Sequence, residues 1–407
     1  MRGLLLAIGV LVLLEACTAS STRRSEISDE ELLSGSALDP SFAVSAPVIS
    51  IDDAFALDDE MQEFVRQIRD VGGDSSMKVI HLLQAMKQRG LFSLEYNEAL
   101  THTVSGTFHE HRGNCLSFTM LFIALAREAG LHARYQLVDV PPQWNLDSDL
   151  VVIANHVNAV INSRTDKDFV IDFNKANFHG DFVTHKIDDA YAAALFYTNL
   201  GAEAMLRRDY PESFTLLREA VHARADVAPP WVNLGVLYGR QGLYDYAEAA
   251  YLRALQIAPQ ERSALANLAG IYEAMGDTER AAEYRERVRR YQDINPYYHY
   301  ARAQKAYREA LYEDTLAELR RAIRLRSDES VFYALQGQAF TALGRDVEAA
   351  KSFARASESQ RQESLVRTEA KASSAPGRLP HPSYTTGNAV FQPARPDVLV
   401  QLPDDKN

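Results

Sequence analysis

The 407-residue sequence predicts an α+β domain followed by an all-α solenoid of repeated helix pairs. Two observations lead to this fold class. Between residues 49 and 177, amphipathic helical segments come first and strand-like segments follow, which is the order of an α+β domain. From about residue 190 the sequence repeats every 34 residues, which is the period of a helix–turn–helix unit.

The overall composition is that of a globular protein without a nucleic-acid partner. Hydrophobic residues make up 46% of the chain and charged residues 24%, which are ordinary globular values. The net charge is −12, and no basic stripe is present that could hold phosphates. The arginines of residues 285–290 and 320–326 are interleaved with glutamates, so they predict ion-paired helix surfaces.

Residues 1–17 have the form of an export signal. Arg2 is followed by the apolar run Leu4–Leu14, which is short for a membrane span. The ending at Cys17 resembles the lipobox of bacterial lipoproteins. That resemblance implies that Cys17 is lipidated and anchors the protein in the cell envelope. Thr18 follows where aspartate would favour the inner membrane, so we expect the outer membrane, facing the periplasm. The alternative is an ordinary secretory signal or an uncleaved anchor.

The next segment is expected to be a disordered tether, and the α+β domain begins after it. Residues 18–45 are rich in serine, alanine and acidic residues and lack an apolar period. The domain itself is expected over residues 46–188. Apolar residues at helical spacing predict its first helices over residues 59–71 and 76–90.

Cys115 lies where a reactive thiol would be stabilised. Gly113 and Asn114 favour a turn or a helix N-cap, and the apolar run of residues 116–129 predicts a largely buried helix. Unpaired N–H groups and the helix dipole favour a thiolate in its first turn. The alternative is that Cys115 is a small buried hydrophobic residue. With Cys17 lipidated, Cys115 has no disulfide partner in an oxidising compartment, which favours a reactive role.

A histidine and an aspartate occur in the strands that follow. Strand-like segments cover residues 133–140, 155–161 and 168–173; His156 opens the second, and Asp172 lies near the end of the third. Pairing of the last two strands would bring these side chains together. A thiolate nucleophile needs a base, and the base needs a carboxylate to orient it. Cys115, His156 and Asp172 are therefore the candidate catalytic residues.

These residues occur in three short motifs that resemble the transglutaminase-like superfamily. The motifs are Gly113-Asn114-Cys115-Leu116-Ser117-Phe118-Thr119, Asn155-His156-Val157-Asn158 and Val170-Ile171-Asp172. The resemblance implies a papain-like core in which Cys115 is the nucleophile, His156 the general base and then acid, and Asp172 the orienting group. It also implies a thioester formed from a glutamine-type amide or another acyl donor, which an amine or water resolves.

We expect neither a metal nor a cofactor. His109 and His111 precede Cys115 closely, but no second pair of ligands follows at the spacing of a metal site. No cluster of acidic residues suggests a calcium site either.

The 34-residue period resembles the tetratricopeptide repeat. Asn199, Asn233 and Asn267 mark the step, small residues recur where helices would cross, and five units are expected over residues 190–361. Such units stack into a solenoid with a concave face that binds a protein or peptide. The residues considered for lining that groove are Asn199, Asn233, Asn267, Tyr297, Tyr300 and Tyr307. The alternative is that they belong to the repeat scaffold.

Residues 362–407 contain six prolines and are expected to form a mostly disordered tail. The whole chain is then expected to be an envelope lipoprotein that acts by thioester acyl transfer or amide hydrolysis on a protein or peptide recruited by its repeats. The alternative function is that of a non-catalytic adaptor, which binds a protein partner in the groove of the repeats.

Overall fold

The protein is described by a computed structural model that covers residues 27–43, 48–70, 75–91, 95–97, 100–138, 143–144, 151–152, 156–161, 169–172 and 184–372. The predicted signal segment with Cys17, and the predicted tail beyond residue 372, lie outside these residues. Within the described ranges, no helix combines the length and apolar character needed to span a membrane.

The first domain has the predicted α+β order. Its helices are α2 (Ile51–Phe55), α3 (Asp59–Arg69), α4 (Ser75–Gln88), α5 (Val104–Glu110) and α6 (Cys115–Glu128). Its strands are β1 (Glu95–Tyr96), β2 (Arg112–Gly113), β3 (Ala133–Val138), β4 (Gln143–Trp144), β5 (Val151–Val152), β6 (His156–Ile161), β7 (Phe169–Ile171) and β8 (Thr184–Ile187). Four of these strands form one antiparallel sheet in the order β7-β6-β3-β8.

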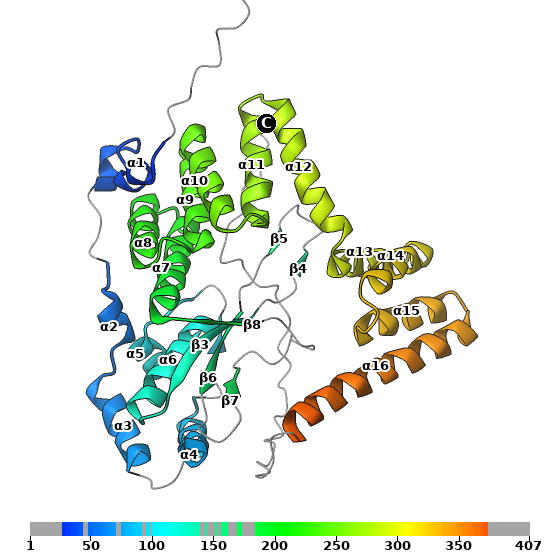
Figure 1. Cartoon of the computed structure of the whole chain (residues 1–407), viewed down its shortest axis with the longest axis horizontal. Helices are drawn as coiled ribbons and strands as arrows, with labels where there is room; N and C mark the ends of the chain where they lie inside the picture. The colour runs from blue at the N-terminus through cyan, green and yellow to red at the C-terminus, as the bar shows by residue number, and fades with distance from the viewer. Residues whose placement is uncertain are drawn as a thin grey trace, which may run out of the picture.

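The helix α6 forms the centre of this domain. It carries apolar side chains on nearly every side, and ten of its fourteen residues are buried. One hydrophobic core joins α6 to α3, α4 and α5 and to the strands β3 and β6. The helix is therefore held between the other helices and the sheet (Figure 1).

A helical solenoid follows the sheet, in five consecutive helix pairs. In residues 189–372, which are described throughout, the helices are α7 (Asp189–Leu206), α8 (Tyr210–Ala223), α9 (Ala228–Arg240), α10 (Tyr244–Ile257), α11 (Arg262–Ala274), α12 (Thr278–Asp293), α13 (Pro296–Arg308), α14 (Tyr312–Leu325), α15 (Ser330–Ala342) and α16 (Asp346–Ala372). They run as an arc from α7, beside the sheet, to α16 (Figure 1). The helix α16 extends past residue 361, so the predicted start of the tail at residue 362 is wrong.

The first repeat is fused to the α+β domain. Phe196 and Tyr197 of α7 belong to the same hydrophobic core as α6. The Tyr197 hydroxyl donates a hydrogen bond to the carbonyl of Ile49 at 3.0 Å. In addition, the Arg127 guanidinium makes two hydrogen bonds of 2.7 Å to the Asp189 carboxylate. The domain and the first repeat therefore form one packed unit.

The remaining repeats fall into two cores. One extends through α8 to α12 and includes Trp231, Tyr251 and Tyr272. The other is separate and is formed by α13, α14 and α15 around Phe332. Only Ala281 and Tyr284 are buried in α12, which lies between the two. The apolar packing of the solenoid is thus interrupted between its third and fourth repeats.

Part of the predicted tether is ordered. Residues 27–43 contain α1 (Asp29–Ser34) and the 3-10 helix η1 (Pro40–Ala43), and Leu32, Leu38 and Phe42 are buried in the core of the repeats. The Tyr238 hydroxyl donates to the Leu32 carbonyl at 2.5 Å. The prediction of a tether over residues 18–45 is therefore wrong for this stretch, which covers the side of α8 and α10.

Candidate active site

The helix α6 begins at Cys115 because two residues before it set the backbone. Asn114 is extended, and its side-chain oxygen accepts a hydrogen bond from the Ser117 N–H at 3.0 Å, which is an N-cap. Gly113 has φ +153°, and a Cβ atom there would come within 2.8 Å of the Ser117 Cβ. Cys115 is thus the first helical residue, as the sequence predicted, and it is partly exposed.

The N-cap is itself fixed by the preceding loop. The Asn114 amide donates to the Thr101 hydroxyl at 2.7 Å, and the Ser117 hydroxyl donates to the Asn114 side-chain oxygen at 3.0 Å. The Ser117 hydroxyl also accepts from the His102 N–H at 2.9 Å. Because Asn114 and Ser117 are buried, these bonds hold the start of α6 in one arrangement.

The sheet brings His156 and Asp172 together. His156 opens β6 opposite Val138 of β3, and Asp172 directly follows β7, which pairs with β6. The His156 Nε2 lies 2.8 and 2.9 Å from the two oxygens of the Asp172 carboxylate. The imidazole is 3% exposed and the carboxylate 22%. The pairing that the strand pattern suggested is therefore present.

The Cys115 side chain acts on the same imidazole and favours its protonated form. Since Nε2 is engaged by Asp172, Nδ1 is the nitrogen that remains for the sulfur. Burial opposes protonation of His156. The hydrogen bonds and negative charges of Asp172 and Cys115 outweigh it and raise the pKa of His156 from 6.5 to about 9. The surroundings thus favour an imidazolium at neutral pH.

Asn158 is a member of this cluster that the sequence analysis did not single out. Its amide lies 3.4 Å from the Asp172 carboxylate, and its side chain is buried. Asn158 follows His156 by two residues, so both side chains lie on one face of β6. That spacing, together with Asp172 on the paired strand, is the signal that could have identified it.

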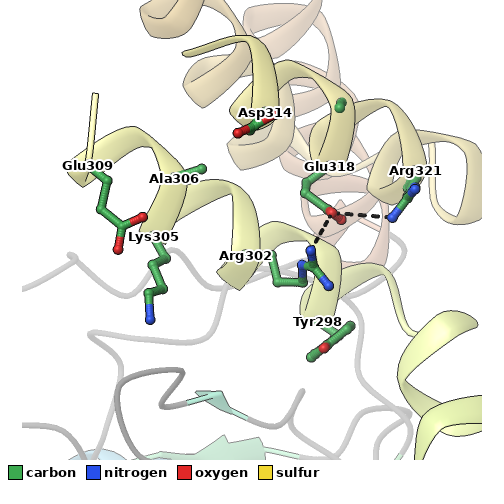
Figure 2. Close-up of a pocket in the computed structure, with 9 residues that line it drawn as sticks. Tyr298, Arg302, Lys305, Ala306, Glu309, Asp314, Glu318 and Arg321 are labelled. Atoms are coloured by element: carbon green, nitrogen blue, oxygen red, sulfur yellow. Dashed lines mark hydrogen bonds and ion pairs between the residues drawn. The ribbon is translucent and has the colours of Figure 1, made fainter. Parts of the chain in front are cut away.

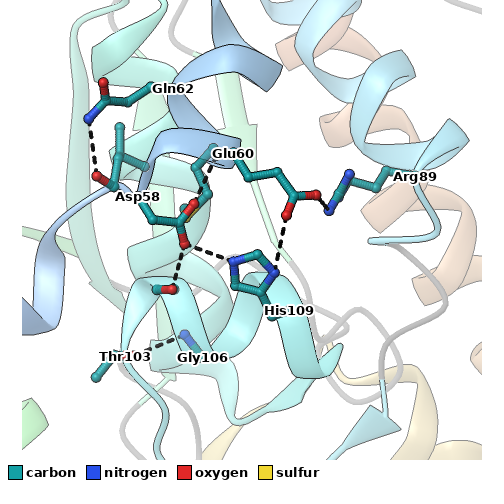
Figure 3. A network of polar contacts seen from close by, with 10 residues as sticks. Asp58, Glu60, Gln62, Arg89, Thr103, Gly106 and His109 are labelled. Carbon is teal, nitrogen blue, oxygen red and sulfur yellow. Dashed lines mark hydrogen bonds and ion pairs between the residues drawn. The ribbon is translucent and has the colours of Figure 1, made fainter.

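A second polar network joins α3 and α5, the helices that precede α6 in the chain. The Asp58 carboxylate caps α3 and accepts hydrogen bonds from the Ser105 hydroxyl at 2.6 Å and the His109 ring at 2.8 Å. Figure 3 shows His109 between Asp58 and Glu60. Burial would raise the pKa of Asp58, but the bonds from Ser105, the Met61 N–H and His109 lower it. In the described part of the chain, no three histidine, cysteine or acidic side chains are grouped to hold a metal.

Family models match both halves of the chain. The model of the transglutaminase-like superfamily matches residues 62–180. These residues form a transglutaminase-like core domain. Tetratricopeptide repeat models match residues 228–261 and 264–293, which are the second and third helix pairs. The transglutaminase-like domain is thus followed by a tetratricopeptide-type series over α7–α16, and such repeats bind proteins.

Individual relatives are similar to part of this chain. Anaphase-promoting complex subunit 3 of Schizosaccharomyces pombe is 24% identical over 157 residues, which are 39% of this chain and 24% of that protein. The chain thus spans about a quarter of the length of this relative. MamA of Desulfovibrio magneticus RS-1 is 17% identical, with a TM-score of 0.24 over 42% of this chain and 96% of that chain. YrrB, described as a TPR protein with an unusual peptide-binding site, is 12% identical, with a TM-score of 0.24 over 43% of this chain and 92% of that chain.

The predicted partner-binding residues do not lie on an open surface. Asn233 and Asn267 are 0% and 1% exposed, and Asn199 is 9% exposed, so the asparagine column is buried. The three tyrosines are half-buried in the last core, where Tyr297 and Tyr300 contact the Phe332 ring and Tyr307 contacts Tyr312.

A charged groove lies on the fourth repeat instead. It has a volume of about 590 Å³ and is lined by α13 and α14. Glu318 lies in it with little exposure and binds Arg302 at 3.1 Å and Arg321 at 3.3 Å (Figure 2). Lys305 lines the groove near Glu309, and β4 of the transglutaminase-like domain lies against α13. The groove is thus on a helix that the domain itself contacts.

Proposed function

We propose that this protein is a lipid-anchored envelope enzyme in which Cys115, His156 and Asp172 catalyse acyl transfer or amide hydrolysis through a thioester. The observation that carries the proposal is that one buried imidazole is bonded to the Asp172 carboxylate and has its protonated form favoured by the Cys115 side chain. This is the arrangement of a nucleophile, its base and the group that orients the base. The match of residues 62–180 to the transglutaminase-like superfamily supports it.

The acylation step uses the ion pair of thiolate and imidazolium. The Cys115 sulfur attacks the carbonyl carbon of an amide, and the carbonyl π electrons move to the oxygen. When this intermediate collapses, the C–N bond breaks and the His156 Nδ1 gives its proton to the leaving nitrogen. The products are a thioester on Cys115, a free amine and a neutral His156. The N–H of Cys115, at the start of α6, is the candidate donor to the oxyanion.

The deacylation step restores the enzyme. The neutral His156 takes a proton from an incoming amine or water, which attacks the thioester carbon. The C–S bond then breaks, and the thiolate is stabilised again by the imidazolium. Asp172 accepts the Nε2–H throughout, which keeps Nδ1 directed to the sulfur. An amine gives a cross-linked or transferred product, and water gives a hydrolysed one.

The repeats would recruit the protein or peptide on which the site acts. Tetratricopeptide-type repeats bind proteins, and the groove on α13 and α14 offers charged side chains next to a helix that contacts β4. The resemblance of the segment ending at Cys17 to a lipobox supports attachment to the outer membrane, facing the periplasm. These assignments place an acyl-transfer site on a membrane-tethered scaffold.

Turnover by wild-type protein and by Cys115→Ala tests the proposal. Casein would serve as the glutamine donor and a fluorescent primary amine as the acceptor, and released ammonia would report hydrolysis. We expect wild type to incorporate the amine or release ammonia, and Cys115→Ala to do neither. Envelope proteins captured by the repeats should bind both forms equally. If captured partners are neither acylated nor cleaved by wild type, the protein is an adaptor and the catalytic assignment is wrong.

A further inference from the structure

Thr119 links the helix of the nucleophile to the strand of the base. It follows Cys115 by four residues in α6, so the two side chains lie on the same face of the helix. Thr119 is fully buried, and a buried hydroxyl requires a hydrogen-bond partner. Its hydroxyl donates to the carbonyl of Val157 at 3.0 Å, and Val157 directly follows His156. This hydrogen bond therefore adds to the apolar core that joins the segments carrying the sulfur and the imidazole.

The described pairing at the start of β6 is with β3. Among the described residues, the pairing of β6 with β7 covers Ala159 to Ile161. Pairing with β3 continues to His156, where Val138 is its partner. The position of His156 relative to Asp172 depends on the sheet, whereas its position relative to Cys115 depends on how α6 meets β6. The bond from Thr119 acts on the second of these distances.

We propose that Thr119 is a positioning residue that keeps the His156 imidazole within hydrogen-bond reach of the Cys115 sulfur. Its consequence for turnover rests on the proposed function, but its effect on the thiol does not require a substrate. Without the hydroxyl, the start of β6 loses its hydrogen bond to α6 while the bond between His156 and Asp172 is kept. The imidazole is then less well placed to activate the sulfur, and Cys115 is alkylated more slowly.

The test is the pH profile of Cys115 alkylation by iodoacetamide in the full chain. The extent of reaction is read by mass spectrometry of the peptide that contains Cys115, so Cys17 does not interfere. An ordinary thiol has a pKa near 8.5 and reacts slowly at pH 6, whereas a thiolate paired with an imidazolium reacts there. Since a misplacement of about 1 Å between reacting groups can cost 10²-fold, we expect Thr119→Val to react about tenfold more slowly than wild type at pH 6.

Two further variants separate positioning from stability. Thr119→Ser keeps the hydroxyl and should keep the wild-type profile. Thr198→Val is the matched control, because Thr198 is also fully buried and its hydroxyl bonds a carbonyl, that of Ala194 at 2.6 Å, inside α7. It should leave the profile unchanged. If Thr119→Val does not fold, Thr119→Ala removes the same hydroxyl without adding bulk and is assayed in the same way.

Each outcome decides one point. If Thr119→Val or Thr119→Ala is slow at pH 6 and Thr119→Ser is not, the positioning role is supported. If wild type is reactive at pH 6 and the variants without the hydroxyl match it, the role of Thr119 is excluded while the proposed function stands. If wild type itself reacts only as an ordinary thiol, both proposals are wrong.

Discussion

The second and third repeats are packed through apolar residues, whereas the third and fourth are not. Leu234 in α9 and Leu268 in α11 occupy the same position of the 34-residue period, and both are fully buried. The equivalent residue of α13 is Arg302, whose side chain is 46% exposed. One turn later, Leu237 and Ile271 are buried, and Lys305 lines the open groove in their place.

The difference teaches that a regular period does not guarantee a continuous core. The period preserves the pairing of two helices inside each repeat, because that pairing uses the small residues where they cross. The contact between successive repeats uses other positions, and in α13 these are charged. The chain thus consists of one block, from the transglutaminase-like domain to α12, and a two-repeat module formed by α13 to α16. Three predictions test this division.

The largest effect is expected from exchanging the side chains at the equivalent positions. Leu268→Arg places an unpaired charge in a closed core and should lower the free energy of unfolding by about 3–5 kcal/mol. Arg302→Leu removes only a partly exposed partner of Glu318, which keeps Arg321, and should change it by less than about 1 kcal/mol. Urea denaturation followed by circular dichroism measures both. Equal losses in the two variants would show that the repeats form one continuous stack.

The next effect is a dependence of stability on pH that is confined to the larger block. Because the pKa of His156 is raised from 6.5 to about 9, its stabilising contribution is complete below pH 6.5 and is lost as the pH rises through 9. The contribution amounts to at most about 3 kcal/mol. Amide hydrogen exchange, corrected for its intrinsic pH dependence, should accelerate over this range in α6 and in α7, which shares its core.

The two-repeat module provides the internal reference for this measurement. Exchange in α14 and α15 should show no such change, because a separate core holds them. Asp172→Asn removes the carboxylate that raises the pKa of His156. It should therefore reduce the pH dependence of amide hydrogen exchange in α6. The assignment of the effect to His156 fails if Asp172→Asn keeps the full dependence.

The smallest effect compares two glycines at the same position of the period. A Cβ atom at Gly235 would lie 2.4 Å from the ring of Tyr251, which is enclosed in the larger block. At Gly337 it would lie 2.6 Å from the ring of Phe353, which is 40% exposed and can turn outward. We expect Gly235→Ala to lower the free energy of unfolding by about 1–3 kcal/mol. Gly337→Ala should lower it by less than half of that amount. Thermal denaturation of both variants measures the difference, and the reverse order would contradict it.

The sequence was sufficient for elements whose signal is local. The turn at Gly113, the cap at Asn114 and the apolar run after Cys115 determine where α6 starts, and alternation determines β6. Asp172 could be placed near His156 because successive antiparallel strands pair. Thr119 could not be identified, since its partner is a backbone carbonyl 38 residues later and no side-chain pattern marks it.

Predictions that depended on packing between distant elements were the ones that failed. Leu32, Leu38 and Phe42 are irregularly spaced in a polar segment, so nothing local shows that Phe214 and Tyr238 bury them. The asparagine column was visible as a period, but its burial depends on the helices packed around it. The break after α12 was visible only as a change from leucine to arginine, which gains its meaning once the buried positions are known.

The ordered N-terminal segment has a consequence for how the molecule would sit on a lipid bilayer. Nine residues separate Cys17 from Ile27, where the described part of the chain begins, and a chain of that length reaches about 32 Å at most. An acyl chain on Cys17 would therefore hold the side of α8 and α10 within a short distance of the bilayer. That flank would stay turned toward the headgroups, and the protein could reach only those molecules that pass close to the bilayer surface.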